Sequence, residues 1–285
     1  MKNHYRINRF QLVTSMASAL DLVSPRMAHH HKRVAYIALR IAAATAHPPQ
    51  AKQEVAIAAS LHDIGVLSTR ERVETSMDKS GHHSAGFGYE LLRKFRPFQG
   101  VAELIRFQHV PWEAGRGQHF RNAAVPMGSH IIHLANRIDE SIEPDVPILA
   151  QARTICREME RHAGSMFVPE FVDAFLRLAR AESFWLDLVS PGHDELLAHH
   201  AVFSDIELDI DGLLEFAEMW GHVIDFRSRY TATHSSGVAA CAQVLAQRFG
   251  FPEKRCKQSR SRATCTTSAS SRSRWRCWRS RASWM

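Results

Sequence analysis

The sequence predicts an all-α protein, a helical bundle followed by a second and incomplete helical unit. Apolar residues recur at helical spacing along most of the chain, and no alternating β-run of useful length appears. The chain has 285 residues, of which 45% are hydrophobic and 23% charged, so a sizeable core can be buried. These observations together favour stacked helices over a sheet.

The predicted helices follow one another closely. Residues 32–46 place Val34, Ile37, Ala38 and Ile41 on one face. The next helix begins at Pro49, because proline fits the first helical turn, and is expected to stop at Gly65. Further helical patterns occupy residues 87–95, 100–110, 127–142, 146–164 and 168–188.

The domain organisation is predicted from changes in this pattern. Residues 10–185 are expected to form the first unit, and the Gly-, Pro- and His-bearing stretch at 186–205 a linker. A second unit is expected over 206–258. Residues 259–285 contain Ser, Arg and three Trp without a hydrophobic period, so disorder is predicted there.

The net charge of +7 comes from the end of the chain. Residues 257–285 hold eight basic residues and no acidic one, and subtracting those eight charges leaves −1 for residues 1–256. The charge therefore gives no reason to expect nucleic acid as a partner of the folded part.

Cysteine usage and the N-terminal sequence indicate a cytoplasmic protein. The five cysteines lie far apart, at Cys156, Cys241, Cys256, Cys265 and Cys277, with no CxxC spacing. An odd and scattered set argues against a disulfide framework. The N-terminal segment has no apolar run long enough for a membrane span or signal peptide, so no membrane partner is expected.

Polar residues on helices that should be apolar are the main functional signal. His62 and Asp63 are adjacent at the end of a helix that looks buried, and a buried Asp requires a cation or a hydrogen-bond donor. Imidazole and carboxylate groups from several helices hold divalent iron, manganese or zinc in helical bundles. The alternative is structural, since "HHH" at 29–31 could be a solvated loop and a lone His is more often structural than a ligand.

Several segments in order resemble the HD-GYP branch of the HD metal-dependent phosphohydrolases. They are "HHHKRVAYIALRIA", "AASLHDIGVL", "GHHSAGFGYELL", "VAELIRFQHVPWEAGRG" and "IIHLANRID", with "GSMFVPEFVDAFLRL" similar to the closing segment. The resemblance covers roughly residues 10–185. It implies a helical domain with two or three divalent metal ions that hydrolyses cyclic di-GMP.

The resemblance also implies the site residues. By this resemblance Asp63 would be the catalytic residue, a carboxylate that bridges two metal ions, which together would activate water and neutralise the phosphodiester. The metal-ligand positions fall on His30, His62, Asp63, one of His82 and His83, His109 and Asn136.

The chain departs from the family pattern at five places. Asn136 stands where the family has a metal-binding Asp, and Gln108 replaces the first His of a His-His pair. Val66 replaces a lysine that contacts substrate phosphate, Arg26 a glutamate found in some members, and "WEAGRGQ" the GYP signature. These departures predict a reduced or lost metal site.

The second unit resembles the start of another HD-GYP domain, with His234 in "YTATHSSGVA" in the place that His30 holds in the first. The expected H-D helix is missing. If one C was lost before Ser259, the codons of the tail can be re-read as "LEIAGYLHDLGKLAVPVEVLAKQGVLD". Thr266 and Thr267 then become H and D, 32 residues after His234, and His62 lies 32 residues after His30. The tail is therefore predicted to be an out-of-frame second HD motif; the alternative is an RS-like nucleic-acid-binding tail.

Two functions follow from these patterns. The first is a metal-dependent phosphohydrolase of the cyclic di-GMP phosphodiesterase type, with weak activity on a cyclic dinucleotide or another phosphoester. The second is a catalytically degenerate HD-GYP module that acts through signalling protein partners. The retained His30, His62, Asp63 and His109 favour the first, and the substitutions at 66, 108 and 136 favour the second.

Overall fold

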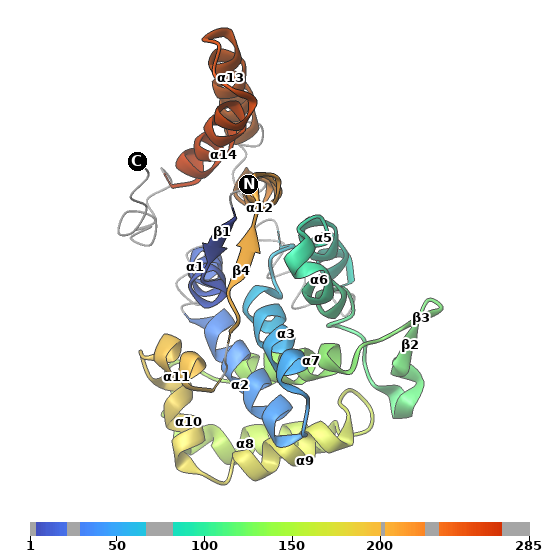
Figure 1. The fold of residues 1–285 in the computed structure, drawn as a ribbon. Coiled ribbons are helices and arrows are strands. Elements are labelled where there is room, and N and C mark those ends of the chain that lie inside the picture. Colours follow the sequence, from blue (N-terminus) through green and yellow to red (C-terminus); the bar gives the residue numbers. More distant parts are fainter. Residues whose placement is uncertain (1–3, 22–28, 67–81, 201–202, 226–233, 270–285) are drawn as a thin grey trace.

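The structure, a computed structural model, describes residues 4–21, 29–66, 82–200, 203–225 and 234–269. Helices dominate this part of the chain, so the predicted all-α class is confirmed (Figure 1). The strands are only two or three residues long, and each pairs antiparallel with one other, β1 with β4 and β2 with β3. None of the described helices is long and apolar enough to cross a membrane.

The elements of the first half come in the expected order. Two 3-10 turns, at Arg96–Phe98 and Glu113–Gln118, flank α6. The strands and helices are β1 (Tyr5–Ile7), α1 (Arg9–Asp21), α2 (His30–Ala44), α3 (Pro49–Leu61), α5 (His82–Leu92), α6 (Gln99–Arg106), β2 (His119–Phe120), β3 (Ala123–Ala124) and α7 (Met127–Glu140).

The second half continues the helical series and ends in a three-helix group. Its elements are α8 (Ile148–Arg161), α9 (Pro169–Leu178), α10 (Glu182–Val189), α11 (His193–His200), β4 (Ile206–Leu208), α12 (Ile210–Asp225), α13 (His234–Arg248) and α14 (Glu253–Ala269). In Figure 1, α13 and α14 lie side by side at the far end of the molecule from α8 and α9.

The main hydrophobic core lies around α2 and α3. The apolar face predicted for α2 is fully buried, since Val34, Ile37, Ala38 and Ile41 are each 0% exposed. Helices α3 and α7 pack against α2, and α3 begins at its proline as expected. It ends at Leu61 rather than at Gly65, because residues 62–65 already form a turn.

Gly65 explains how closely that turn approaches α5. A Cβ atom at this position would lie 2.1 Å from the backbone oxygen of Ser84 and 2.5 Å from the nitrogen of Gly88. Only glycine therefore lets the turn after α3 contact α5. The histidines expected as ligands, His82 and His83, are the first two residues of that helix.

The stretch 186–205, expected as a linker, contains helical structure that packs on the bundle. Leu188 of α10 and Leu197 of α11 belong to the main core, and α11 contacts α2. The core continues into α12 through Phe216 and Trp220. The domain boundaries stay a prediction, but the residues between them are more regular than their composition indicates.

The beginning of the tail also differs from the prediction of disorder. Helix α14 extends to Ala269, so residues 259–269 are helical, while 270–285 lie outside the described residues. No proline or glycine interrupts this segment, and Cys256 and Thr264 are buried where α14 packs against α12 and α13. Contact with two neighbouring helices thus orders a segment that lacks an apolar face of its own.

Candidate metal centre

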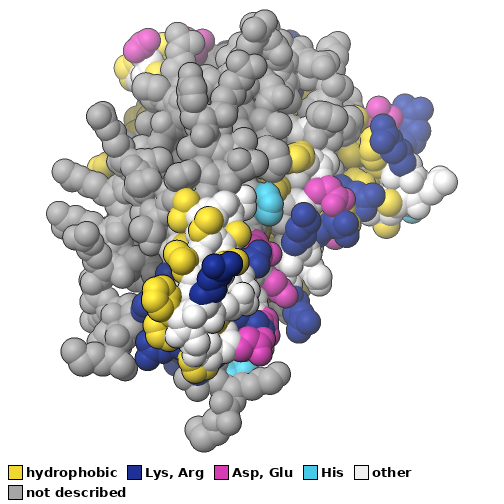
Figure 2. Space-filling model, turned by 90° about the horizontal axis from the view of Figure 1, so that it is seen from above, with side chains coloured by type: hydrophobic (Ala, Val, Ile, Leu, Met, Phe, Trp, Pro, Cys, Tyr) yellow, Lys and Arg dark blue, Asp and Glu magenta, His cyan; other side chains and the backbone are white. Residues whose placement is uncertain are grey.

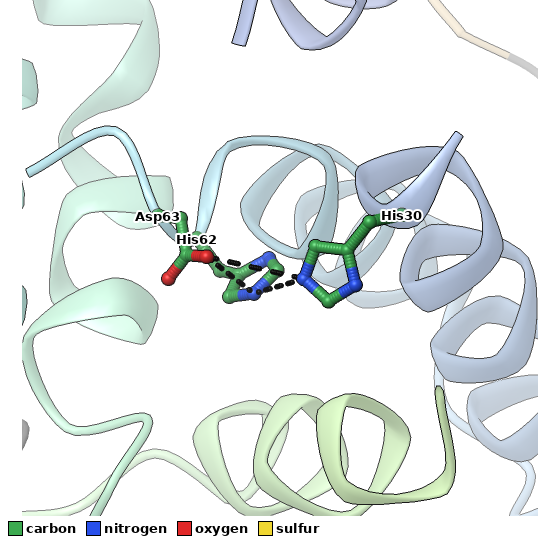
Figure 3. Close-up of side chains that lie close together, drawn as sticks. All are labelled: His30, His62 and Asp63. Atoms are coloured by element: carbon green, nitrogen blue, oxygen red, sulfur yellow. Dashed lines mark hydrogen bonds and ion pairs between the residues drawn. The ribbon is translucent and has the colours of Figure 1, made fainter. Parts of the chain in front are cut away.

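His30, His62 and Asp63 form a compact group at the start of α2 and in the turn after α3 (Figure 3). Each offers one ligand atom, and these atoms lie within 4.8 Å of one another. The Nε2 atoms of the two imidazoles are 3.3 Å apart. The nearest Asp63 oxygen lies 3.9 Å from His30 Nε2 and 3.6 Å from His62 Nε2. The described residues contain no other such group of His, Cys, Asp or Glu.

Both imidazoles use Nδ1 for a hydrogen bond outside the group and direct Nε2 toward the other ligand atoms. His30 Nδ1 donates to an oxygen of Asp139 at 2.6 Å, and His62 Nδ1 donates to the carbonyl oxygen of Ala59 at 2.8 Å. A carboxylate and a carbonyl only accept, so each Nδ1 carries the proton of the neutral ring. Two Nε2 lone pairs then face each other, an arrangement that a cation between them would stabilise. The donor set therefore fits a divalent metal ion.

Asp139 orients His30 from the opposite helix, α7. Its side chain is 2% exposed and also accepts from Arg33, at 2.6 Å from Nε. Burial disfavours the charge of Asp139, but its hydrogen bonds and electrostatic interactions with His30 and Arg33 outweigh burial, so its pKa is lowered. An ionised carboxylate behind a ligating histidine is the usual support of such a ligand, because it fixes the ring and raises its basicity.

His31 is a buried neighbour of this group rather than part of a solvated loop. It is 0% exposed, its Nδ1 is hydrogen-bonded to Asp21, and its ring lies 5.3 Å from that of His62. Burial lowers the pKa of His31 to about 3, against the opposing effect of Asp21. The "HHH" segment thus places His29 at the surface and the other two inside.

The other predicted ligands lie in different surroundings. His109 is half-buried in the turn after α6 and interacts electrostatically with His133 of α7, which is 6% exposed. Burial lowers the pKa of His133 to about 3. The side chains of His82 and His83 lie outside the described residues. The group of His30, His62 and Asp63 does not include His109, and the roles of His82, His83 and His109 as metal ligands stay predictions.

Two departures from the family pattern have clear structural surroundings. Gln108 is buried and its Nε2 donates at 2.8 Å to the carbonyl oxygen of His62, so it holds the backbone of the turn that carries Asp63. Val66 is buried, 8% exposed, at the end of the same turn. Arg26 lies outside the described residues.

Asn136 lies on α7 one turn before Asp139 and Glu140. Its Nδ2 donates at 3.0 Å to Glu140 Oε1, and its Oδ1 is buried without a hydrogen-bond partner among the described residues. Arg137 donates to the other oxygen of Glu140 at 2.9 Å. Partial burial raises the pKa of Glu140, Arg137 opposes this shift, and the negative charge of Asp63 adds to it. Glu140 is thus within electrostatic reach of the metal group.

A cavity of about 600 Å³ adjoins this face of α7. It lies between α7, α8 and the loop that follows α8, and Arg137 and Glu140 form part of its wall. The remaining lining is mixed, with polar Gln151 and Thr154 and apolar Phe167. Its size is in the range of small-molecule pockets.

Sequence reasoning missed the residues that support the ligands. Asp139, Arg33 and Glu140 were not predicted as site residues, although Asp139 could have been noticed as a carboxylate at a core position of the helix 127–142. Its partners come from α2, more than one hundred residues earlier, and only the fold brings them together.

Comparison with known proteins places these features in a family. A model of the HD domain matches residues 27–170. The chain is 28% identical over 264 residues to 3'3'-cGAMP-specific phosphodiesterase 1 of Vibrio cholerae, covering 87% of this chain and 60% of that protein. It is 27% identical over 166 residues to a cyclic di-GMP phosphodiesterase of Thermotoga maritima, covering 53% of this chain and 44% of that protein. The chain therefore spans about half of the length of these curated relatives.

A solved structure shows the same fold at lower sequence similarity. It is a crystal structure of a cyclic GMP-AMP-specific phosphodiesterase of Vibrio cholerae, with a TM-score of 0.66 and 18% identity. The match covers 92% of this chain and 70% of that one. At this identity the match supports the fold alone.

Proposed function

Because the chain belongs to the HD domain family, we propose that it is a metal-dependent phosphohydrolase that cleaves a phosphodiester bond of a cyclic dinucleotide. The observation that carries the proposal is the convergence of His30, His62 and Asp63, with both Nε2 atoms directed into the group. The two curated relatives, which are named for hydrolysis of cyclic GMP-AMP and cyclic di-GMP, support the substrate class.

In this proposal each residue has a defined part. His30, His62 and Asp63 would hold a divalent ion, iron, manganese or zinc, and Asp63 would be the bridging carboxylate if two ions bind, as the resemblance implies. When bound, the metal supplies positive charge that activates water and neutralises the phosphodiester oxygens. Asp139 and Ala59 keep the two imidazoles in the tautomer that presents Nε2. Gln108 holds the turn in place.

The HD-GYP branch is part of this proposal. It rests on the order of the family-like motifs along the chain. In this branch, His82 or His83, His109 and Asn136 would be further metal ligands. A cytoplasmic location likewise stays a prediction.

The test combines metal content and hydrolysis. Protein purified with Mn²⁺ should contain the metal and should hydrolyse cyclic di-GMP or 3'3'-cGAMP when Mn²⁺ is added. Asp63→Ala should lower both metal binding and hydrolysis by more than about 100-fold, since even residues that only support ligands cost about 10–100-fold. Asp173→Ala, at an exposed position of α9, is the matched control and should leave both unchanged. Hydrolysis that is unaffected by Asp63→Ala would place the chemistry elsewhere.

A second candidate is a catalytically degenerate module that contacts signalling proteins. Gln108 favours it, because a side chain that donates to the His62 carbonyl replaces a family histidine and offers no imidazole at that position. Metal binding that depends on Asp63 without any hydrolysis of the two cyclic dinucleotides would support this second candidate over the first.

We also propose that α13 belongs to a second HD-type unit whose next helix is encoded out of frame. The equal 32-residue spacing from His30 to His62 and from His234 to Thr266 supports this proposal. The test is the coding DNA. One base restored before the codon for Ser259 should open a frame with an intact H-D-x-G-K, whereas a stop codon within a few residues would refute the proposal.

A further inference from the structure

The pair formed by Asn136 and Glu140 has an arrangement that the metal centre itself does not explain. Asn136 is 8% exposed, and its amide Oδ1 is a buried acceptor without a partner among the described residues. A buried acceptor left without a donor or cation is destabilising. At the position where a carboxylate is expected, the chain therefore keeps a carbonyl oxygen that still needs a positively charged or hydrogen-donating partner.

The carboxylate of Glu140 determines which way this amide faces. Its Oε1 accepts from Asn136 Nδ2 at 3.0 Å, so the NH₂ group is directed to Glu140 and the other end of the amide bears the oxygen. Arg137 holds the second oxygen of Glu140 at 2.9 Å, which fixes the carboxylate in this position. Asn136 and Glu140 are four residues apart and therefore lie on one face of α7. The adjacent residue, Asp139, is the one that is hydrogen-bonded to His30.

The location of the pair connects it to the metal group. Helix α7 packs against α2, which begins with His30, and against α3, which precedes the His62-Asp63 turn. In Figure 3, α7 is the light green helix that faces the three side chains. The negative charge of Asp63 and the imidazole of His30 both act on Glu140. Asp139, which is next to Glu140 on α7, is hydrogen-bonded to His30 at 2.6 Å, so the turn of α7 that holds the pair adjoins the ligand group.

We propose that Glu140 and Asn136 together act as a substitute for the missing carboxylate, with Asn136 Oδ1 as a metal ligand and Glu140 as the residue that positions and polarises it. A hydrogen bond from the amide NH₂ to an anionic oxygen shifts electron density toward Oδ1, which makes a neutral amide a stronger ligand. The negative charge that the substitution removed from position 136 is retained one helical turn away. This inference rests on the proposed metal centre and adds a residue that the family pattern does not assign.

The experiment measures Mn²⁺ affinity of the full chain by calorimetry, so it does not depend on hydrolysis. Glu140→Gln keeps the shape and an oxygen that can accept from Asn136, but it removes the charge and replaces the oxygen that accepts from Arg137 with an amide NH₂. We expect it to weaken Mn²⁺ binding by about 10–100-fold, the usual effect of removing a group that supports a ligand. Glu143→Gln, an exposed glutamate just beyond the end of the same helix, is the matched control and should leave affinity unchanged.

The same change in a second background separates polarisation from a merely structural role. In Asn136→Asp, two carboxylates would lie at hydrogen-bond distance and repel each other. Glu140→Gln should then tighten Mn²⁺ binding instead of weakening it. An effect of the same sign and size in both backgrounds, or no effect in the native background, would overturn the inference.

The outcomes also distinguish this inference from the proposed function. If the native chain binds Mn²⁺ and loses it in Asp63→Ala while Glu140→Gln binds as the native chain does, the metal centre stands and the role of Glu140 is refuted. If the native chain binds no Mn²⁺, both proposals fall. Circular dichroism of each variant shows whether the fold is retained, and Glu140→Gln, at a side chain that is 36% exposed, is expected to retain it.

Discussion

Two helices of this chain begin with a histidine in similar sequence surroundings, α2 at His30 and α13 at His234, and their environments differ. Eleven of the fifteen residues of α2 are buried, against α3, α7 and other helices. Among the side chains described for α13, only Ala239 and Ala246 are buried. Similar helix sequences therefore reach different structures, because α2 has the partner helices that cover its apolar residues.

The difference is visible on the surface. The hydrophobic residues at and after the end of α13 are exposed, with Leu245 at 56%, Phe249 at 77% and Phe251 at 50%. Figure 2, which looks down on the α13 end of the molecule, shows hydrophobic side chains at the surface there. We define Val238, Val244, Leu245, Phe249 and Phe251 as the α13 patch. Exposed apolar side chains gathered near one end of a helix favour association.

The largest expected effect is a loss of stability when a phenylalanine is replaced by alanine in the bundle, compared with the same substitution near the end of α13. Phe175→Ala removes a side chain that is 0% exposed in the bundle, and should lower the free energy of unfolding by about 3–5 kcal/mol through lost burial and the cavity left behind. Phe249→Ala, at a side chain that is 77% exposed, should change it by no more than about 0.5 kcal/mol. Urea denaturation followed by circular dichroism measures both. Equal losses would show that α13 is packed more tightly than the structure indicates.

A smaller effect is expected when the hydrogen bond that orients His30, at the start of α2, is weakened. Asp139→Asn should weaken Mn²⁺ binding by about 10–100-fold, because the imidazole loses the ionised acceptor that fixes its tautomer and Arg33 loses its charge partner. Calorimetric titration measures the affinity, with Asp173→Asn on the exposed face of α9 as the control. Unchanged affinity in Asp139→Asn would show that His30 is oriented without the carboxylate.

The smallest effect on stability is expected from substitutions in the α13 patch, which should instead change self-association. The double variant Leu245→Ser and Phe249→Ser should alter the free energy of unfolding by no more than about 0.5 kcal/mol while lowering self-association. Static light scattering against concentration measures the association. The control removes two exposed apolar side chains of α10, Leu186→Ser and Val189→Ser, which are 49% and 53% exposed. A similar decrease in the control would show that the patch has no special part in association.

The sequence by itself determined the fold class and predicted three residues that the structure brings together. Helical periodicity identified the buried face of α2, and the order of the family-like motifs predicted that His30, His62 and Asp63 converge, which the structure brings within 4.8 Å. Helical periodicity is a local property of the sequence, and the order of motifs can also be read directly from it. Helix ends were less accurate, as at Leu61, because the turn that follows is set by its contact with α5.

Only the tertiary structure decided which groups support the ligands. Asp139 reaches His30 across 109 positions of sequence, and Gln108 reaches the carbonyl oxygen of His62 across 46. The family resemblance placed Asn136 at a metal-ligand position, and the fold shows that it donates to Glu140, whose carboxylate interacts electrostatically with Asp63. Helical order in residues 259–269 likewise follows from contacts with α12 and α13. Periodicity shows which face of a helix is buried, but the neighbour that covers that face depends on how the helices pack.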